Sequence, residues 1–193
     1  MGVTQETWLW FKHYLPSDIT LKICELGDQQ FMCCPPFEES SWVNQYFKSI
    51  GQEIVTIDLN GNSGALMLDL GKEITDKSLL NTFDIITNFG TSEHVENLYY
   101  CTKNIHNMAK QGCLVFNVSP HPDNWPLHGF HFLGMPFYEE LAKVCNYQIV
   151  DLFKRKLNIG GDDSVQTHCL YQKIEDSVFC SMEEFYKLPI CKK

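Results

Sequence analysis

The sequence lacks several features that mark large classes of proteins. It has no apolar run long enough for a membrane-spanning helix. It has no Cys-x-x-Cys pair, no complete Gly-x-Gly-x-x-Gly fingerprint, no internal repeat and no low-complexity segment. These absences argue against a membrane span and a repeat protein, and they disfavour a nicotinamide-dependent reductase.

Basic residues are also scarce. The chain has 15 Lys and Arg against 24 Asp and Glu, which gives a formal net charge of −9. Because binding to nucleic acids is dominated by basic contacts to phosphates, a broad nucleic-acid surface is not expected. The single basic cluster, Lys154-Arg155-Lys156, is interpreted as a solvated strand end.

Cysteine, by contrast, is plentiful, but the spacing of the cysteines does not indicate a set of disulfide bonds. The nine cysteines are odd in number and irregularly spaced, and several lie inside apolar runs, where a thiol acts as a small hydrophobe. This favours free thiols in a reducing compartment. The apolar run Trp8–Phe11 is too short for a signal peptide and is followed by Lys12 and His13. We therefore expect a soluble, cytoplasmic protein.

Four short, mostly apolar runs end in an acid or an amide. They are Leu21–Glu25, followed by Leu26 and Gly27, then Ile54–Asp58, Ala65–Asp69 and Phe83–Asn88. Continuous apolar runs are typical of buried parallel strands, and ligands bind outside the carboxyl ends of such strands. The polar groups at these ends predict one ligand site for a nucleoside-like cofactor.

Hydrophobic spacing and turn residues predict one α/β domain over residues 1–193, with a helical cap over 1–19, a core over 20–174 and a helical tail over 175–193. Strands and helices alternate up to residue 145, and two late strands are close enough to form a hairpin. Strands are expected over 21–26, 53–59, 65–70, 83–88, 113–118, 147–156 and 165–174. Helices are expected over 4–14, 41–50, 76–81, 93–110 and 136–145, with a last short helix capped by Ser181 and Glu184.

This order of elements resembles the class I S-adenosylmethionine (SAM)-dependent methyltransferases. The segment Glu25-Leu-Gly27 is similar to the start of their first motif, and the segment 83–95 is similar to their fourth motif and the helix after it. The segments 129–132 and 137–147 resemble the region between their fifth and sixth strands. The resemblance implies a Rossmann-like sheet of seven strands in the order 3-2-1-4-5-7-6, with strand 7 antiparallel.

The resemblance also implies a set of cofactor-binding residues. Asp58 is similar to the acid that holds the ribose hydroxyls, and Asp69 to the acid near the adenine amino group. A carboxylate can accept both ribose hydroxyls, and a glycine allows the backbone to approach the ligand closely. The cofactor set is Glu25, Gly27, Asp58, Asp69, Asn88 and Gly90, and each acid or amide has a turn-forming role as its alternative.

The first motif departs from the family pattern. Gly27 is followed by Asp28-Gln-Gln30 where the family has further glycines, and a Pro-containing loop over 28–41 delays the next helix. Two hypotheses follow. The first is a SAM-dependent methyltransferase that acts on a small-molecule acceptor. The second is a binding or scaffold protein of the same fold that has lost use of the cofactor.

Histidines supply the candidate catalytic groups. His94 follows the fourth strand, and His128 and His131 lie in the loop 119–134; all three are candidate bases because the ordinary pKa of histidine is near neutrality. In some relatives a Glu-His pair at the position of Glu93-His94 binds a divalent metal together with a later His. Here His128 or His131 is the candidate for that later ligand, whereas Gly90 stands where those relatives have a second Glu. We assign no metal site from the sequence, and a divalent metal stays an open alternative.

Overall fold

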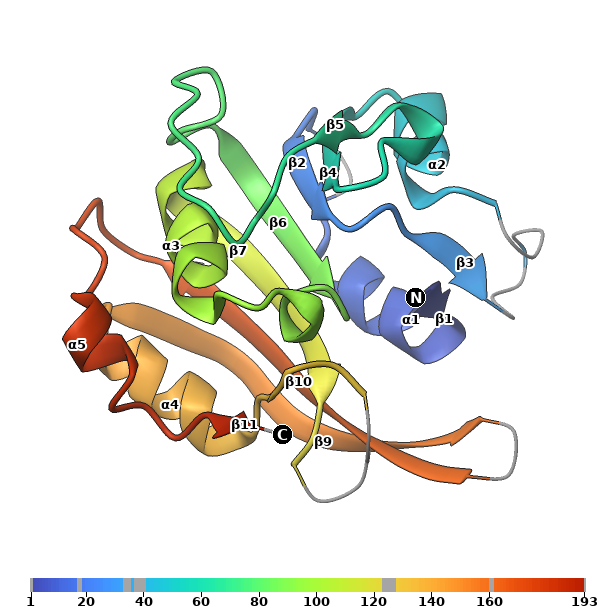
Figure 1. Cartoon of the computed structure of the whole chain (residues 1–193). Helices are drawn as coiled ribbons and strands as arrows, with labels where there is room; N and C mark the ends of the chain where they lie inside the picture. Colours follow the sequence, from blue (N-terminus) through green and yellow to red (C-terminus); the bar gives the residue numbers. More distant parts are fainter. Residues whose placement is uncertain are drawn as a thin grey trace.

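The computed structural model describes residues 2–16, 19–32, 36, 41–122, 128–159 and 162–192. Its centre is a seven-stranded sheet in the order β5-β4-β2-β6-β7-β10-β9 (Figure 1). The strands are β2 (Lys22–Leu26), β4 (Glu53–Asp58), β5 (Leu66–Met67), β6 (Phe83–Phe89), β7 (Ala109–Pro120), β9 (Tyr147–Ile159) and β10 (Asp162–Lys173). In chain order this is 3-2-1-4-5-7-6, as expected.

Strand directions follow the expected pattern as well. The pairs β4–β5, β2–β4, β2–β6 and β6–β7 are parallel, whereas β10 pairs antiparallel with both β7 and β9. The parallel strands therefore end at one edge of the sheet, where β2, β4 and β6 lie side by side. The predicted α/β class with a mostly parallel sheet is confirmed.

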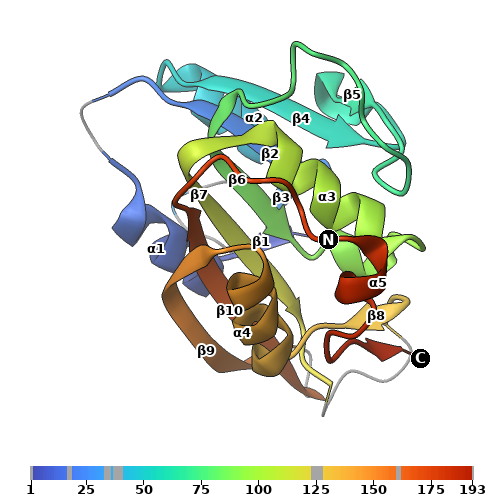
Figure 2. The same ribbon diagram turned by 90° about the vertical axis from the view of Figure 1, so that its left-hand side faces the viewer.

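Helices cover both faces of the sheet (Figures 1 and 2). The helices α3 (Leu98–Met108), α4 (Met135–Val144) and α5 (Met182–Phe185) pack on one face, and α1 (Gln5–Tyr14) and α2 (Val43–Ser49) pack on the other. Each face has its own cluster of buried apolar side chains. At roughly 1.5–3 kcal/mol for each large side chain buried, these two clusters supply most of the favourable free energy of folding.

The N-terminal helix α1 is fixed by aromatic packing. Trp8 and Phe11 pack against Phe47 of α2, and Trp10 lies edge-on against Phe116 of β7. The indole N–H of Trp10 donates to Asp151 of β9 at 2.9 Å. Thr4 caps the start of α1 through its hydroxyl oxygen, and the helix ends before Pro16. The helix α1 therefore packs on the sheet as part of the hydrophobic core.

Five expectations about local structure are wrong. The predicted loop over 28–41 contains β3 (Gln30–Met32), which pairs in parallel with the unexpected strand β1 (Gly2–Thr4). The predicted loop over 119–134 contains β8 (His131–Phe132), which pairs with β11 (Cys191–Lys192). Residues 76–81 form turns in place of a helix, because Asp76 accepts hydrogen bonds from the backbone and hydroxyl of Ser78. The strand β5 covers two residues of the predicted 65–70.

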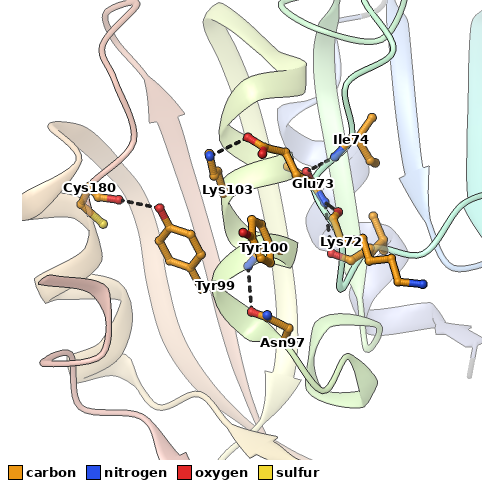
Figure 3. Close-up of polar contacts among 10 residues, drawn as sticks. Lys72, Glu73, Ile74, Asn97, Tyr99, Tyr100, Lys103 and Cys180 are labelled. Atoms are coloured by element: carbon orange, nitrogen blue, oxygen red, sulfur yellow. Dashed lines mark hydrogen bonds and ion pairs between the residues drawn. The ribbon is translucent and has the colours of Figure 1, made fainter. Parts of the chain in front are cut away.

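The fifth error concerns the helix predicted over 93–110. Residues Ser92–His94 form a separate 3-10 turn, η2, and α3 begins only at Leu98. The side chain of Asn97 accepts a hydrogen bond from the backbone of Tyr100 and so caps the start of α3 (Figure 3). At its other end α3 stops at Met108, and residues 109–112 already belong to β7. Glu93 and His94 therefore lie on a turn before the helix.

The capping box predicted at Ser181 and Glu184 is present at the start of α5. The preceding residue, Cys180, accepts a hydrogen bond from the hydroxyl of Tyr99 on α3 at 3.3 Å (Figure 3). Residues 160–161, which lie between the two predicted late strands, are outside the described residues. Two of the nine cysteines, at positions 33 and 34, are outside them as well. Within the described residues, no helix is long and apolar enough to cross a membrane.

Candidate functional site

A pocket of about 670 Å³ opens at the carboxyl ends of β2, β4 and β6. Of the residues named from the sequence, Gly27, Asp58, Asp69, Gly90 and His94 line it. Its volume is within the range of small-molecule sites, and its place is where open α/β sheets bind their ligands. These five residues come from four separate segments, and the fold brings them together around one pocket.

The turn after β2 lies against the turn after β4. The backbone N–H of Gly27 donates to the carbonyl of Ile57 at 2.8 Å, and the N–H of Asp28 donates to Oδ2 of Asp58 at 3.0 Å. Oδ1 of Asp58 accepts from the N–H of Asn60 at 2.7 Å. These bonds orient the Asp58 carboxylate at the pocket wall.

The glycines at the strand ends have conformations that other residues adopt with strain. Gly27 has φ of +74°, and a Cβ there would lie 2.4 Å from Oγ1 of Thr91. Gly90 has φ of +79°. Both glycines line the pocket, and at Gly27 the missing side chain leaves room for Thr91.

Asp69 lines the pocket from the segment that follows β5. Its Oδ1 accepts from the N–H of Gly71 at 2.9 Å, and its Oδ2 lies 3.2 Å from Nζ of Lys72. The hydrogen bond from Gly71 and the neighbouring Lys72 lower the pKa of Asp69, so this carboxylate is ionised at neutral pH. Lys72 and Asn97, which also line the pocket, lie on neighbouring segments (Figure 3).

Glu25 lies at the end of β2 but is buried behind the pocket and is not part of its lining. Its carboxylate accepts a hydrogen bond of 2.8 Å from the hydroxyl of Thr56 on β4. Burial raises the pKa of Glu25 to about 8, although the Thr56 hydroxyl acts in the opposite direction. In this structure Glu25 supports the turn that carries Gly27.

Asn88 is also buried and does not line the pocket. Its amide donates to Ser92 at 2.9 Å and to Asn117 at 3.0 Å, and its oxygen accepts from the backbone of Ser92 at 3.1 Å. These bonds join β6, β7 and the turn η2. Asn88 therefore positions η2, which carries Glu93 and His94.

The three histidines have different surroundings. His94 is exposed and lines the pocket. His128 lies next to it, with ring centroids 4.8 Å apart. Burial lowers the pKa of both rings, and His128 adds to the effect on His94. His131 is buried, and its Nε2 lies 3.2 Å and 3.1 Å from the carbonyl oxygens of Val95 and Glu96, so it ties the later loop to the segment after η2.

Several pocket residues were not among those named as candidate site residues. Asp28, Thr91 and Phe130 are the main ones. Asp28 and Thr91 directly follow Gly27 and Gly90, which were named as candidates. Their position next to these glycines is the sequence signal from which they could have been predicted. Burial, together with the negative charge of nearby Asp58, raises the pKa of Asp28.

Comparison with known proteins finds no matching family model and no matching curated protein. Solved structures do match. A putative methyltransferase from Bacillus halodurans C-125 has a TM-score of 0.59 at 10% identity, over 87% of this chain and 98% of the other. A 1,6-didemethyltoxoflavin-N1-methyltransferase from Burkholderia thailandensis, with bound 1,6-didemethyltoxoflavin and S-adenosylhomocysteine (SAH), has a TM-score of 0.57 at 10% identity, over 80% and 72%.

The [4+2]-cyclase SpnF also matches, with a TM-score of 0.55 at 12% identity, over 80% of this chain and 74% of the other. At such low identities these likenesses show the fold. The chain thus has the Rossmann-like fold of the class I SAM-dependent methyltransferases. The cyclase is a reminder that one fold carries more than one chemistry, so function has to be argued from the site.

Proposed function

We propose that this chain is a SAM-dependent methyltransferase that acts on a small-molecule acceptor, and that residues 1–193 form one such domain. One observation carries the proposal. On a methyltransferase fold, the pocket at the carboxyl ends of β2, β4 and β6 is open and is lined by the carboxylates of Asp58 and Asp69 and by Gly27 and Gly90. The apolar Phe31, which follows the glycine-poor turn, is buried against Trp8 in the cluster that includes α1 and α2, and it does not line the pocket.

The residues divide between the two ligands by position. Asp58 accepts the ribose hydroxyls, and Asp69 accepts from the adenine amino group. The backbone of Gly27 and Gly90 contacts the remainder of the cofactor. When bound, SAM supplies a methyl group already activated on a sulfonium, so alignment of the acceptor with that group carries much of the rate.

His94 faces the acceptor. As the acceptor's oxygen or nitrogen bonds to the methyl carbon and the sulfur–methyl bond breaks, a neutral imidazole takes the proton that the acceptor loses. The lowered pKa of His94 keeps the ring neutral at pH 7, as a base requires. His128 lies behind His94, and His131 holds the loop that carries both Phe130 and His128.

The small-molecule acceptor class is favoured by charge and by pocket shape. The net charge of −9 opposes a polyanionic acceptor. The pocket wall nearest His94 includes Phe130, whose side chain is 53% exposed, and an exposed aromatic face suits a planar or apolar acceptor.

A second candidate function, a binding protein of this fold without turnover, has its own support. Both carboxylate oxygens of Asp58 already accept backbone N–H groups, and the turn after Gly27 has no further glycine. Incubation of the purified chain with methyl-labelled SAM and a cell extract, separated afterwards by size, together with SAM and SAH titration by calorimetry, decides between the candidates. We expect label in the low-molecular-weight fraction. Label in protein or nucleic acid contradicts the acceptor class. A folded protein that transfers no label and binds neither SAM nor SAH favours the binding protein.

A further inference from the structure

Asp28 and Gln29 form the part of the pocket wall where the sequence departs from the methyltransferase pattern, and the proposed function gives their side chains no role. Both residues line the pocket, as Asp58 does. Oδ2 of Asp28 and Oε1 of Gln29 are buried, and neither atom has a hydrogen-bond partner among the residues that the structure describes. Gln29 as a whole is only 3% exposed. The wall therefore contains two acceptor oxygens for which the protein supplies no donor.

The acids at this end of the pocket also have no basic partner. The charged side chains that line the pocket are the carboxylates of Asp28, Asp58, Asp69 and Glu96 and the ammonium group of Lys72. Lys72 lies 3.2 Å from Asp69, whereas no Lys, Arg or His of the described residues forms an ion pair with Asp28 or Asp58. Burial, together with the charge of Asp58, raises the pKa of Asp28. A positively charged ligand would compensate this negative wall.

Neutral side chains hold Asp28 in place. Oδ1 of Asp28 accepts from the hydroxyl of Ser63 and, at 3.5 Å, from Nδ2 of Asn44. Nδ2 of Asn44 also donates to Ser63 at 2.7 Å and to Thr56 at 3.1 Å. Ser63 has φ of +47°, a conformation that a residue with a side chain adopts with strain. These partners fix the carboxylate but do not cancel its charge, so the charge acts on whatever fills the pocket.

We propose that Asp28 selects the cofactor by charge, because it strengthens the binding of SAM, whose sulfur is positively charged, relative to SAH, whose sulfur is neutral. This inference rests on the proposed function, since it concerns the same ligand in the same pocket. SAM and SAH differ by one methyl group and one positive charge, and a negative wall acts on the charge. The departure from the glycine pattern at residue 28 thereby favours the methyl donor over the product that remains after transfer.

The test is calorimetric titration of the whole chain with SAM, SAH and sinefungin in a buffer of low ionic strength. Sinefungin has a protonated amino group in place of the methylated sulfur. It therefore separates the effect of the charge from the effect of the methyl group. A unit charge about 8 Å from another, in partly screened surroundings, changes an affinity roughly fivefold. Calorimetry resolves a change of that size.

Asp28→Asn is the decisive variant, because asparagine keeps the shape of the side chain and an acceptor oxygen for Ser63 but removes the charge. We expect it to weaken the binding of SAM and of sinefungin by about fivefold or more, and the binding of SAH by less than about twofold. Circular dichroism and the melting temperature show whether the variant is folded. Unchanged affinities for SAM and sinefungin overturn the proposal, and so does an equal loss for all three ligands.

Two further variants are matched controls. Ser63→Ala removes the hydrogen bond to Asp28 without a change of charge, so the ratio of the SAM and SAH affinities should not change. Glu96→Gln removes the same charge from an exposed residue of the pocket, where water screens it, and should change the ratio less than Asp28→Asn does. If either control changes the ratio as much as Asp28→Asn, the role assigned to Asp28 is wrong.

The salt dependence of the wild type is a second readout, which a purely structural role of Asp28 would not produce. Mobile ions screen charges, so KCl at about 0.5 M should weaken the binding of SAM and sinefungin more than the binding of SAH. The same salt dependence for all three ligands contradicts charge selection, whether or not Asp28→Asn folds.

Failure of this proposal can be told apart from failure of the proposed function. A wild type and an Asp28→Asn variant that bind SAM and SAH with the same affinity ratio reject charge selection alone. A folded wild type that binds none of the three ligands rejects both proposals. Charge selection requires binding and not transfer, so the titrations decide it even if no methyl label is transferred.

Discussion

The backbone N–H of Asp28 donates a hydrogen bond of 3.0 Å to the carboxylate of Asp58. This bond joins the turn after the first strand of the sheet core, β2, to the turn after its neighbour β4. The bond helps to fix the geometry of the glycine-poor turn that follows Gly27. The pocket wall is thereby formed before a ligand arrives.

Asp58→Ala should weaken SAH binding by about 10- to 150-fold, because hydrogen bonds to a charged group contribute roughly 1.5–3 kcal/mol. Calorimetry measures this change. The matched control is Asp76→Ala, which removes a carboxylate that likewise accepts backbone and hydroxyl groups but lies away from the pocket. Equal affinities of Asp58→Ala and the wild type contradict the assigned ribose contact.

Gly129→Ala should destabilise the protein by about 1–3 kcal/mol, because residue 129 has a positive φ and its Cβ would overlap the carbonyl of Glu93. Urea unfolding measures the loss. Gly112→Ala is the control that measures the cost of a positive φ without a steric overlap, since Gly112 has φ of +87° and open space around its Cβ position. If the two variants lose the same free energy, the loop does not depend on close contact with Glu93.

Glu25 should make stability fall as pH rises. Its folded pKa of about 8 lies above the ordinary 4.5, so its protonated form stabilises the folded state below pH 4.5, and this contribution is lost as the pH rises towards 8. Between pH 5 and pH 7.5 its share is about 2–3 kcal/mol. We expect Glu25→Gln to lose that share of the pH dependence in urea unfolding. An unchanged pH profile would show that Glu25 is ionised in the folded protein.

His168 should act in the opposite direction, at low pH. It is fully buried on β10 and stacks on Phe153, and neither ring nitrogen has a hydrogen-bond partner among the residues that the structure describes. Burial, aided by the charge of Arg155, lowers its pKa to about 3. The unfolded chain takes up this proton near pH 6.5, so stability is complete above pH 6.5 and is lost as the pH falls towards 3.

His168→Phe keeps a ring on Phe153 and removes the titrating group. At pH 5 we expect the variant to gain about 1–2 kcal/mol in the free energy of unfolding relative to the wild type. The gain should shrink at pH 7.5. A constant difference at both pH values would assign the effect to packing.

The sheet could be predicted from the sequence because its parallel strands are buried on both faces. Runs such as Ile54–Asp58 and Phe83–Asn88 are continuous in apolar character and end in polar residues, and this is a local signal. The pairs β1–β3 and β8–β11 could not be predicted in the same way. Each joins two or three residues from distant parts of the chain, and no periodicity marks so short a ladder.

The site could be predicted only in part for a related reason. Gly27, Asp58, Asp69 and Gly90 were named from the resemblance to the methyltransferases, and they line one pocket because the ends of adjacent parallel strands meet. Glu25 and Asn88 lie at the same strand ends, but their side chains are buried in the interior. The direction of a side chain at a strand end could not be predicted from the sequence. His128 and His131 are three residues apart in one loop, and only the fold shows which of them lies beside Glu93.

Titration of the wild-type chain with SAH by calorimetry tests the central claim most directly, because every assigned role depends on a nucleoside-shaped ligand in the pocket at the ends of β2, β4 and β6. The account predicts one site with micromolar or tighter affinity, and a rise in melting temperature with SAH concentration. A folded protein that gives neither heat nor a thermal shift with SAH or SAM contradicts it.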